Sequence, residues 1–194
     1  KDLVFNGSAS AQRTVAGSEP MGLLADQFTN RNPNFAQVTF VIHDGGITIR
    51  PAAATVTITG RHNTADYDGD IHTVSGYDVS ISSELYSEAD FTFNGTAKAT
   101  RTEAGTTNMG LAQSQFTNTN DNFTVTFEVA QDGYVNITKK AVSIVVDNAS
   151  KTYGEDDPEF TGTVTGLENE DDLGTITYSR TNDDEDVDTY EGVL

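Results

Sequence analysis

The chain contains no cysteine and no tryptophan, and its only histidines are His43, His62 and His72. Without cysteine it can build no disulfide framework, no thiolate metal site and no cysteine nucleophile. Its runs of apolar residues are far shorter than the roughly 18 that a membrane span needs. The sequence therefore offers little for catalysis, and we expect no membrane insertion in this segment.

Positive charge is also scarce. The 194 residues carry 11 Lys+Arg against 30 Asp+Glu, for a formal net charge of -19. A nucleic acid or an anionic membrane requires cationic side chains to replace its counterions. We therefore expect no nucleic-acid partner.

Short alternating runs of Thr, Val, Ile, Phe and Tyr are abundant, and such alternation is typical of strands with one buried face. The best helix candidates, Gly22–Phe28 and Gly110–Phe116, each fit a strand or one irregular turn better than a helix. We predict an all-β chain. The clearest predicted strands are Ala53–Ile58, Val79–Ile81, Phe91–Phe93, Thr124–Val129, Val135–Ile137 and Val142–Val146.

Five dipeptides between these runs have the composition of tight turns. Asn, Asp and Gly tolerate the positive φ that two-residue hairpin turns require. We therefore predict hairpin turns at all five positions. They are Asn6-Gly7, Asp44-Gly45, Asp68-Gly69, Asn94-Gly95 and Asp132-Gly133.

An internal repeat is the most informative feature of the sequence. Residues 2–35 recur as residues 90–123, a shift of 88 positions, and about 20 of the 36 positions aligned from Lys1 onward are identical. After a one-residue slip, Val38-Thr39-Phe40 corresponds to Val125-Thr126-Phe127. The register recovers where Asp44-Gly45 stands opposite Asp132-Gly133.

The repeat predicts the domain boundaries. Residues 51–138 form one complete module, 1–50 the C-terminal part of a preceding copy, and 139–194 the N-terminal part of a different module. The last segment holds 15 acidic residues and four basic ones. We expect a piece of a longer tandem array, in which the partial modules expose strand edges that can pair with other chains.

Residues 141–166 resemble the opening of an MBG domain, a mostly-β module repeated in tandem in Gram-positive surface adhesins. The resemblance rests on Lys151-Thr152-Tyr153-Gly154, on Asp157-Pro158 and on Val164-Thr165-Gly166-Leu167. Residues 51–138 resemble related tandem modules that carry a Tyr-Asp-Gly motif, here Tyr67-Asp68-Gly69, and an F-T-N-x-N-x-N-F stretch.

The resemblance implies an extracellular protein on the bacterial cell surface, attached to the cell wall through parts that are not in this segment. It also implies that neighbouring modules of the same chain are partners. For the fold, about 88 residues with seven or so short strands fit an immunoglobulin-like two-sheet sandwich. A β-grasp-like module is the alternative.

The acidic tract 182–188 is the best candidate for a cation site. Carboxylates crowded into seven residues repel one another, and a divalent ion relieves that repulsion. The alternative is a solvated acidic loop that keeps the protein soluble. No cofactor other than calcium is expected. The candidate calcium ligands are Asp183, Asp184, Glu185, Asp186 and Asp188.

A second oxygen-rich segment, Asp66-Tyr67-Asp68-Gly69-Asp70, has three alternating carboxylates. An EF-hand loop would also need a glycine at its sixth position and a glutamate at its twelfth. Those positions hold Ile71 and Tyr77. We therefore interpret this segment as a turn.

Catalysis is not expected. A serine or threonine triad needs a histidine base, yet His43 is replaced by Gln131 in the second copy. Abundant carboxylates guarantee some pair at a glycosidase spacing, so their abundance is no evidence of that chemistry. We predict that the chain is not an enzyme.

Tyrosines can stack on sugar rings, but on strands they more often pack in a half-buried layer. The asparagines of 118–122 can bind a glycan or form Asx turns with their own backbone, and we favour the turns. The tyrosines considered are Tyr77, Tyr86, Tyr134, Tyr153, Tyr178 and Tyr190.

Three functions compete. The first, which we favour, is a non-catalytic stalk or spacer of a bacterial surface adhesin, whose stiffness comes from modules and their junctions. The second is an adhesive module that binds a host glycan or protein. The third is a junction element that calcium stiffens through the acidic tract.

Overall fold

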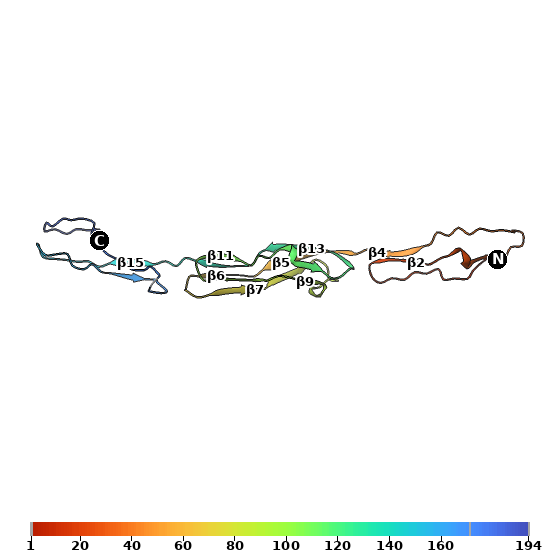
Figure 1. Ribbon diagram of the computed structural model, residues 1–194, viewed down its shortest axis with the longest axis horizontal. Coiled ribbons are helices and arrows are strands. Elements are labelled where there is room, and N and C mark those ends of the chain that lie inside the picture. Colours follow the sequence, from red (N-terminus) through yellow and green to blue (C-terminus); the bar gives the residue numbers. More distant parts are fainter. Residues whose placement is uncertain (1, 171, 194) are drawn as a thin grey trace. The chain divides into compact units, whose positions relative to one another are not determined.

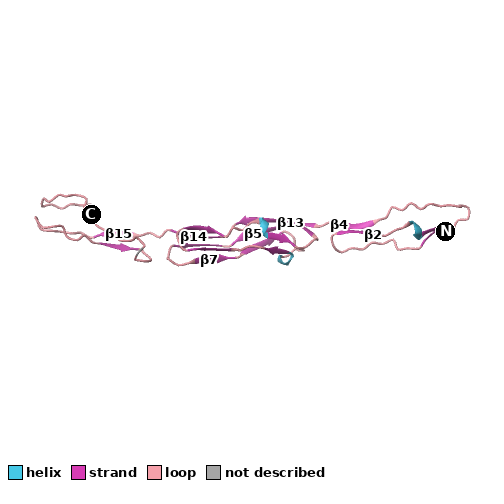
Figure 2. Ribbon diagram, in the orientation of Figure 1, coloured by secondary structure: helices cyan, strands magenta, loops and turns pink. Residues whose placement is uncertain are grey.

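The computed structural model describes residues 2–170 and 172–193. Regular structure in this part of the chain consists of strands and three single-turn 3-10 helices, joined by long loops (Figure 2). The prediction of an all-β chain is confirmed. No helix among the described residues is long and apolar enough to cross a membrane.

The described residues cluster into two compact units. Unit 1 comprises residues 2–60, 77–96 and 110–132, and unit 2 comprises residues 61–76, 97–109, 133–170 and 172–193. The module boundaries at 50/51 and 138/139 rest on the sequence repeat and remain a prediction.

Unit 1 contains three two-stranded antiparallel sheets and one three-stranded sheet (Figure 1). In the three-stranded sheet, β5 (Ala52–Gly60) pairs in parallel with β13 (Phe123–Gln131) and antiparallel with β8 (Tyr77–Ile81). The 3-10 helices are η1 (Ala25–Gln27), η2 (Glu88–Asp90) and η3 (Gln113–Gln115). The two-stranded sheets are β1 (Leu3–Phe5) with β3 (Phe28–Asn30), β2 (Gly17–Pro20) with β4 (Gly46–Ile49), and β9 (Phe91–Phe93) with β12 (Phe116–Asn118).

Unit 2 has a second mixed sheet. In it, β14 (Tyr134–Thr138) pairs antiparallel with β11 (Gly105–Asn108) and in parallel with β6 (His62–Asp66). Two antiparallel pairs complete the unit: β7 (His72–Ser75) with β10 (Lys98–Arg101), and β15 (Ser143–Val146) with β16 (Gly162–Thr165).

All six strands named from alternation are present, extended or shortened by a few residues at their ends. The parallel pairs β5–β13 and β6–β14 are not a feature of immunoglobulin sheets, which are antiparallel. The choice between an immunoglobulin-like sandwich and a β-grasp-like module stays a prediction.

The cores follow from the alternation. Successive side chains of a strand point to opposite faces of the sheet, so Ala54, Val56 and Ile58 share the buried face of β5 in unit 1. Val135 and Ile137 do the same on β14 in unit 2. No described polar or charged residue is fully buried.

The prediction of tight hairpins is wrong at all five Asn-Gly and Asp-Gly dipeptides, because in the described part of the chain none of them joins two strands that pair with each other. The clearest case is Asp132-Gly133. This dipeptide joins β13 to β14, and those strands belong to different sheets. Gly133 has no positive φ. Glycine is required at position 133 for lack of space, because a Cβ there would lie 2.4 Å from Met109 Sδ and 2.6 Å from the Arg61 carbonyl oxygen.

The candidate helical stretches Gly22–Phe28 and Gly110–Phe116 each form one irregular turn that leads into a strand. The turn is η1 before β3 in the first copy and η3 before β12 in the second. In both copies a glutamine side chain closes the turn. Gln27 Oε1 accepts a hydrogen bond from the Leu24 N–H, and Gln115 Oε1 accepts one from the Ala112 N–H, each at 2.9 Å.

Candidate functional site

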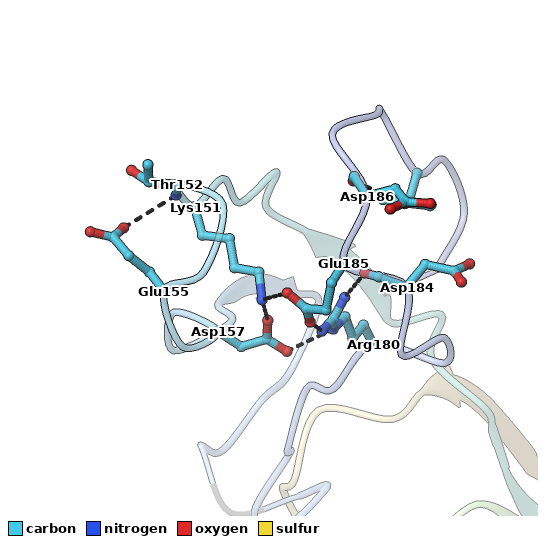
Figure 3. Close-up of polar contacts among 9 residues, drawn as sticks. Lys151, Thr152, Glu155, Asp157, Arg180, Asp184, Glu185 and Asp186 are labelled. Atoms are coloured by element: carbon cyan, nitrogen blue, oxygen red, sulfur yellow. Dashed lines mark hydrogen bonds and ion pairs between the residues drawn. The ribbon is translucent and has the colours of Figure 1, made fainter.

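The acidic tract of residues 182–188 lies beside a closed ring of two cations and two carboxylates in unit 2 (Figure 3). Lys151 Nζ lies 2.8 Å from Asp157 Oδ1 and 2.6 Å from Glu185 Oε2. Arg180 Nε lies 2.7 Å from Asp157 Oδ2, and Arg180 Nη2 pairs with Glu185 Oε1. Each cation therefore contacts both carboxylates, and loops far apart in sequence are held together.

The ring shifts the pKa of all four groups toward their charged forms. The hydrogen bond from Lys151 is the main cause of the lowered pKa of Asp157, and bonds from Lys151 and Arg180 lower that of Glu185. The pKa of Lys151 rises mainly through its bond to Asp157, and that of Arg180 through its bond to Glu185. The ring thus stays charged over a wider pH range than isolated side chains would.

The five predicted calcium ligands have different surroundings. Glu185 belongs to the ring, while Asp184 accepts a hydrogen bond from Arg180 Nη1 at its carbonyl oxygen, 2.7 Å away. The Asp188 carboxylate accepts from the following N–H, that of Thr189. Asp183 is exposed, and Asp186 lies apart from the ring (Figure 3).

Within residues 2–170 and 172–193, no three His, Asp or Glu side chains are grouped so that they could hold a metal ion. Calcium binding by the tract stays a prediction. The ring itself was missed by sequence reasoning, because Lys151 and Asp157 lie more than 20 residues before Arg180 and Glu185. Only the scarcity of cations among the many acidic residues of 139–194 could have suggested that Lys151 and Arg180 are paired.

The segment around Tyr67-Asp68-Gly69 forms a turn that Asp68 closes. Asp68 Oδ1 accepts a hydrogen bond from the Asp70 N–H at 3.0 Å and lies 2.9 Å from His72 Nε2. The bond with His72 is the main cause of a lowered pKa of Asp68. Gly69 adopts φ +76° here. The carboxylate is thus used by the turn itself.

The three histidines occupy unrelated places. His43 is exposed in a loop, and His72 contacts Asp68. The ring of His62 stacks on Tyr134, with centroids 5.1 Å apart. No described contact places a serine or threonine hydroxyl against any of these imidazoles.

The tyrosines considered for glycan stacking divide between the core and the surface. Tyr86 is 3% exposed, and Tyr77 packs edge-on against Phe93 and Phe116, with centroids 5.1 and 5.4 Å apart. By contrast, Tyr153 is 72% exposed. Tyr134, Tyr178 and Tyr190 are half-buried.

The asparagines of 118–122 form Asx turns. Asn118 Oδ1 accepts from the Asn120 N–H at 3.0 Å, and Asn120 Oδ1 accepts from the Asn122 N–H at 3.0 Å. The first copy repeats both bonds at 2.9 Å, from Asn32 to Asn30 and from Asn34 to Asn32. These amides therefore serve the backbone of their own loops.

The aspartates before the Gly45 and Gly133 positions are also equivalent in the two copies. Asp44 accepts hydrogen bonds from the N–H groups of Gly22 and Leu23 at 2.9 and 3.1 Å. Asp132 accepts from Gly110 and Leu111 at 2.9 and 2.9 Å. Each carboxylate ties the end of a loop to a glycine with φ of +73° or +76°.

Comparison with known families identifies the C-terminal segment. A family model described as MBG domain (YGX type) matches residues 142–193, which confirms the MBG resemblance for the C-terminal segment. Domains of this family are typical of bacterial surface proteins. No curated protein and no solved structure matches the chain.

Proposed function

We propose that this segment is a non-catalytic spacer of a bacterial surface adhesin, in which repeated β modules carry a distant part of the protein away from the cell. The MBG match to residues 142–193 supports the surface location. Attachment to the cell wall through other parts of the protein belongs to the same proposal.

The observation that carries the proposal is the use of polar side chains in the repeat. In both copies the same asparagine, aspartate and glutamine positions bond to nearby backbone groups. A binding or catalytic site leaves some polar groups directed at a ligand. Repeated polar positions that serve loop structure favour a scaffold.

Charge supports the same proposal. With a net charge of -19, neighbouring molecules repel one another, and a high net charge keeps proteins soluble and monomeric. Spacers that stand close together on a cell surface benefit from that repulsion because lateral association would collapse the layer.

Small-angle X-ray scattering of the chain tests the proposal. A compact protein of 194 residues has a radius of gyration of about 16 Å. A spacer should give a clearly larger value and a rod-like profile. A compact particle would contradict the proposal and make binding of a host glycan or protein the next function to test.

The same measurement with calcium and with a chelator tests the calcium prediction. If the acidic tract binds calcium and stiffens a junction, the radius of gyration and the maximum dimension should change on chelation. The variant Asp183→Asn/Asp186→Asn is the matched control, because it removes two predicted calcium ligands that take no part in the ion pairs of the ring. Identical profiles in all conditions would remove the calcium prediction and leave the spacer proposal intact.

A further inference from the structure

Residues 1–50 repeat residues 89–138, whereas residues 51–88 have no counterpart elsewhere in this chain. In the second copy those extra residues supply β5, β8 and Tyr86, which cover the repeated part. Among these 194 residues, only the repeated part of the first copy is present. The chain thus holds the same half-module twice, once covered and once uncovered.

Tyr86 shows how the cover is attached. Its side chain is 3% exposed, and its ring lies 5.1 Å from that of Phe123 and 6.4 Å from that of Phe91. Its hydroxyl donates toward the Asp90 carbonyl oxygen and Asn118 Oδ1, each 2.9 Å away. The tyrosine therefore fills an apolar pocket and bonds to two oxygens at its base.

Both oxygens are present in the uncovered copy, in the same local structure. The Asp2 carbonyl oxygen accepts from the Arg31 N–H at 2.8 Å, as the Asp90 carbonyl oxygen accepts from Thr119 at 2.8 Å. Asn30 Oδ1 accepts from Asn32, as Asn118 Oδ1 accepts from Asn120. In the second copy each of these oxygens also bonds to the Tyr86 hydroxyl. Residues 1–50 contain no tyrosine, so they supply no equivalent hydroxyl to the Asp2 carbonyl oxygen or to Asn30 Oδ1.

The apolar side chains above these oxygens line an open groove of about 360 Å³, formed by Leu3, Phe35, Val38 and Phe40 together with Asp2 and the asparagines. Phe35 is 61% exposed, whereas its counterpart Phe123 is 9% exposed. Leu3 is 53% exposed, whereas Phe91 is 8% exposed. The groove is the Tyr86 pocket without its tyrosine.

The strand beside the pocket is also missing in the first copy. Residues 123–131 form β13, paired in parallel with β5 from Phe123 opposite Ala52 to Gln131 opposite Thr59. The corresponding residues 35–43 form no strand, and Val41 is 76% exposed. The backbone there can therefore accept a parallel strand.

We propose that residues 2–43 are a binding site for a tyrosine-bearing strand segment of the type of residues 51–88, supplied by another copy of the module. Its first strand pairs in parallel with residues 35–43. Its tyrosine enters the groove and donates to the Asp2 carbonyl oxygen and to Asn30 Oδ1.

A second whole copy of this chain is not the occupant. These 194 residues contain one such segment and two acceptor half-modules. If the segment moved to another chain, it would expose Phe91, Phe116 and Phe123 in its own chain. The move would therefore bury no additional apolar surface in total. A further segment of the same chemistry is needed.

The test titrates the isotope-labelled 194-residue chain with a synthetic peptide of residues 51–88. Calorimetry gives the affinity, and amide shifts and hydrogen exchange locate the site. The matched peptides are Tyr86→Ala, Tyr86→Phe and, as control, Tyr67→Ala, because Tyr67 lies in unit 2. The matched chains are Phe35→Ser and, as control, Leu24→Ser, which is also exposed, at 59%, but does not line the groove.

We expect one peptide per chain, shifts confined to residues 2–43, and new exchange protection at residues 36–43. Tyr86→Ala and Phe35→Ser should each weaken binding at least about tenfold. Tyr86→Phe should weaken it about fivefold, as for one lost hydrogen bond. Both controls should bind within about twofold of the parent pair.

Equal affinity of the parent and Tyr86→Ala peptides would overturn the proposal, and so would shifts centred on residues 91–131. If the free peptide fails to bind, the segment 51–88 is joined directly before residue 1. Protection of residues 36–43 in that fusion supports the site, and continued fast exchange there overturns it.

Discussion

The two copies of the half-module share their loops and first strand pairs, but the long strand β13 of the second copy has no counterpart in the first. The Asx turns, the aspartate bonds to glycine backbone and the first strand pairs, β1–β3 and β9–β12, recur with a shift of 88 residues. Yet β13 has nine residues, and its counterpart 35–43 has no strand. Nearly the same sequence therefore gives two outcomes.

The difference separates local from non-local causes of structure. Asx turns need only side chains two or three residues away, so each copy forms them by itself. A strand needs hydrogen-bond partners from another strand, and a sheet needs an apolar face that is covered. The second copy has both in β5 and Tyr86, and the first copy has neither.

The largest expected effect compares Phe116 with its counterpart Phe28. Phe116 is 5% exposed and contacts the rings of Tyr77, Phe93 and Phe127, whereas Phe28 is only half-buried. Phe116→Ala should lower the free energy of unfolding by about 3–5 kcal/mol. Phe28→Ala should cost less than about half of that, because less of its surface leaves water.

Urea unfolding followed by hydrogen exchange at β12 and β3 measures the two changes separately. The two variants remove the same atoms from equivalent positions, so each serves as control for the other. Equal losses would show that the covering strands add nothing to the burial of this phenylalanine, and the comparison of the copies would fail.

The second prediction concerns the covering strand itself. Ile58 is fully buried on β5, so Ile58→Ala should destabilise unit 1 by about 2–5 kcal/mol and raise exchange rates along β13. Val41→Ala in the uncovered copy is the control. Because Val41 is 76% exposed, its change should stay within about 0.5 kcal/mol. Unchanged exchange along β13 in Ile58→Ala would contradict the role given to β5.

A smaller effect is expected for Tyr86→Phe. The change keeps the ring and removes the hydroxyl that bonds to Asp90 and Asn118, so stability should fall by about 1 kcal/mol. Tyr153→Phe, at a 72% exposed position, should be neutral. Thermal unfolding of the two variants and the parent chain measures these changes. A neutral Tyr86→Phe would show that the Tyr86 hydroxyl does not contribute to stability.

The sequence was sufficient for the six strands named from alternation, because a pattern such as that of Ala53–Ile58 directly indicates a strand with one buried face. It also predicted the Asx turns of residues 118–122, which depend on neighbours in sequence. Residues 51–88 have no second copy among these 194 residues, and Phe35 is exposed whereas its counterpart Phe123, beside β5, is buried.

Non-local features were beyond the same reasoning. The parallel pairing of β5 with β13 depends on residues about 70 positions apart. The role of Gly133 comes from the approach of Met109 and Arg61, not from its φ. The ring of Lys151, Asp157, Arg180 and Glu185 joins two loops with no shared motif, and for this reason Glu185 was assigned to a calcium site alone.

The smallest effect is a pH dependence that belongs to the covered copy only. Burial is the main cause of the raised pKa of both Tyr86 and Tyr77, whereas a tyrosine in the unfolded chain titrates near 10. Above about pH 10 the unfolded state binds fewer protons than the folded state, so stability falls as pH rises toward the folded-state values. Below about pH 10 the stabilisation is complete.

Urea unfolding of unit 1, measured from pH 8 to above pH 10, should therefore show a free energy of unfolding that declines as the pH rises. The decline should be shallower in Tyr86→Phe and shallower still in Tyr77→Phe/Tyr86→Phe. Exchange within residues 2–43 supplies the internal control, since this region has no tyrosine and should show no decline of this origin. A slope that persists unchanged in the double variant would assign the alkaline loss to the general negative charge of the chain, and the two copies would then respond to pH alike.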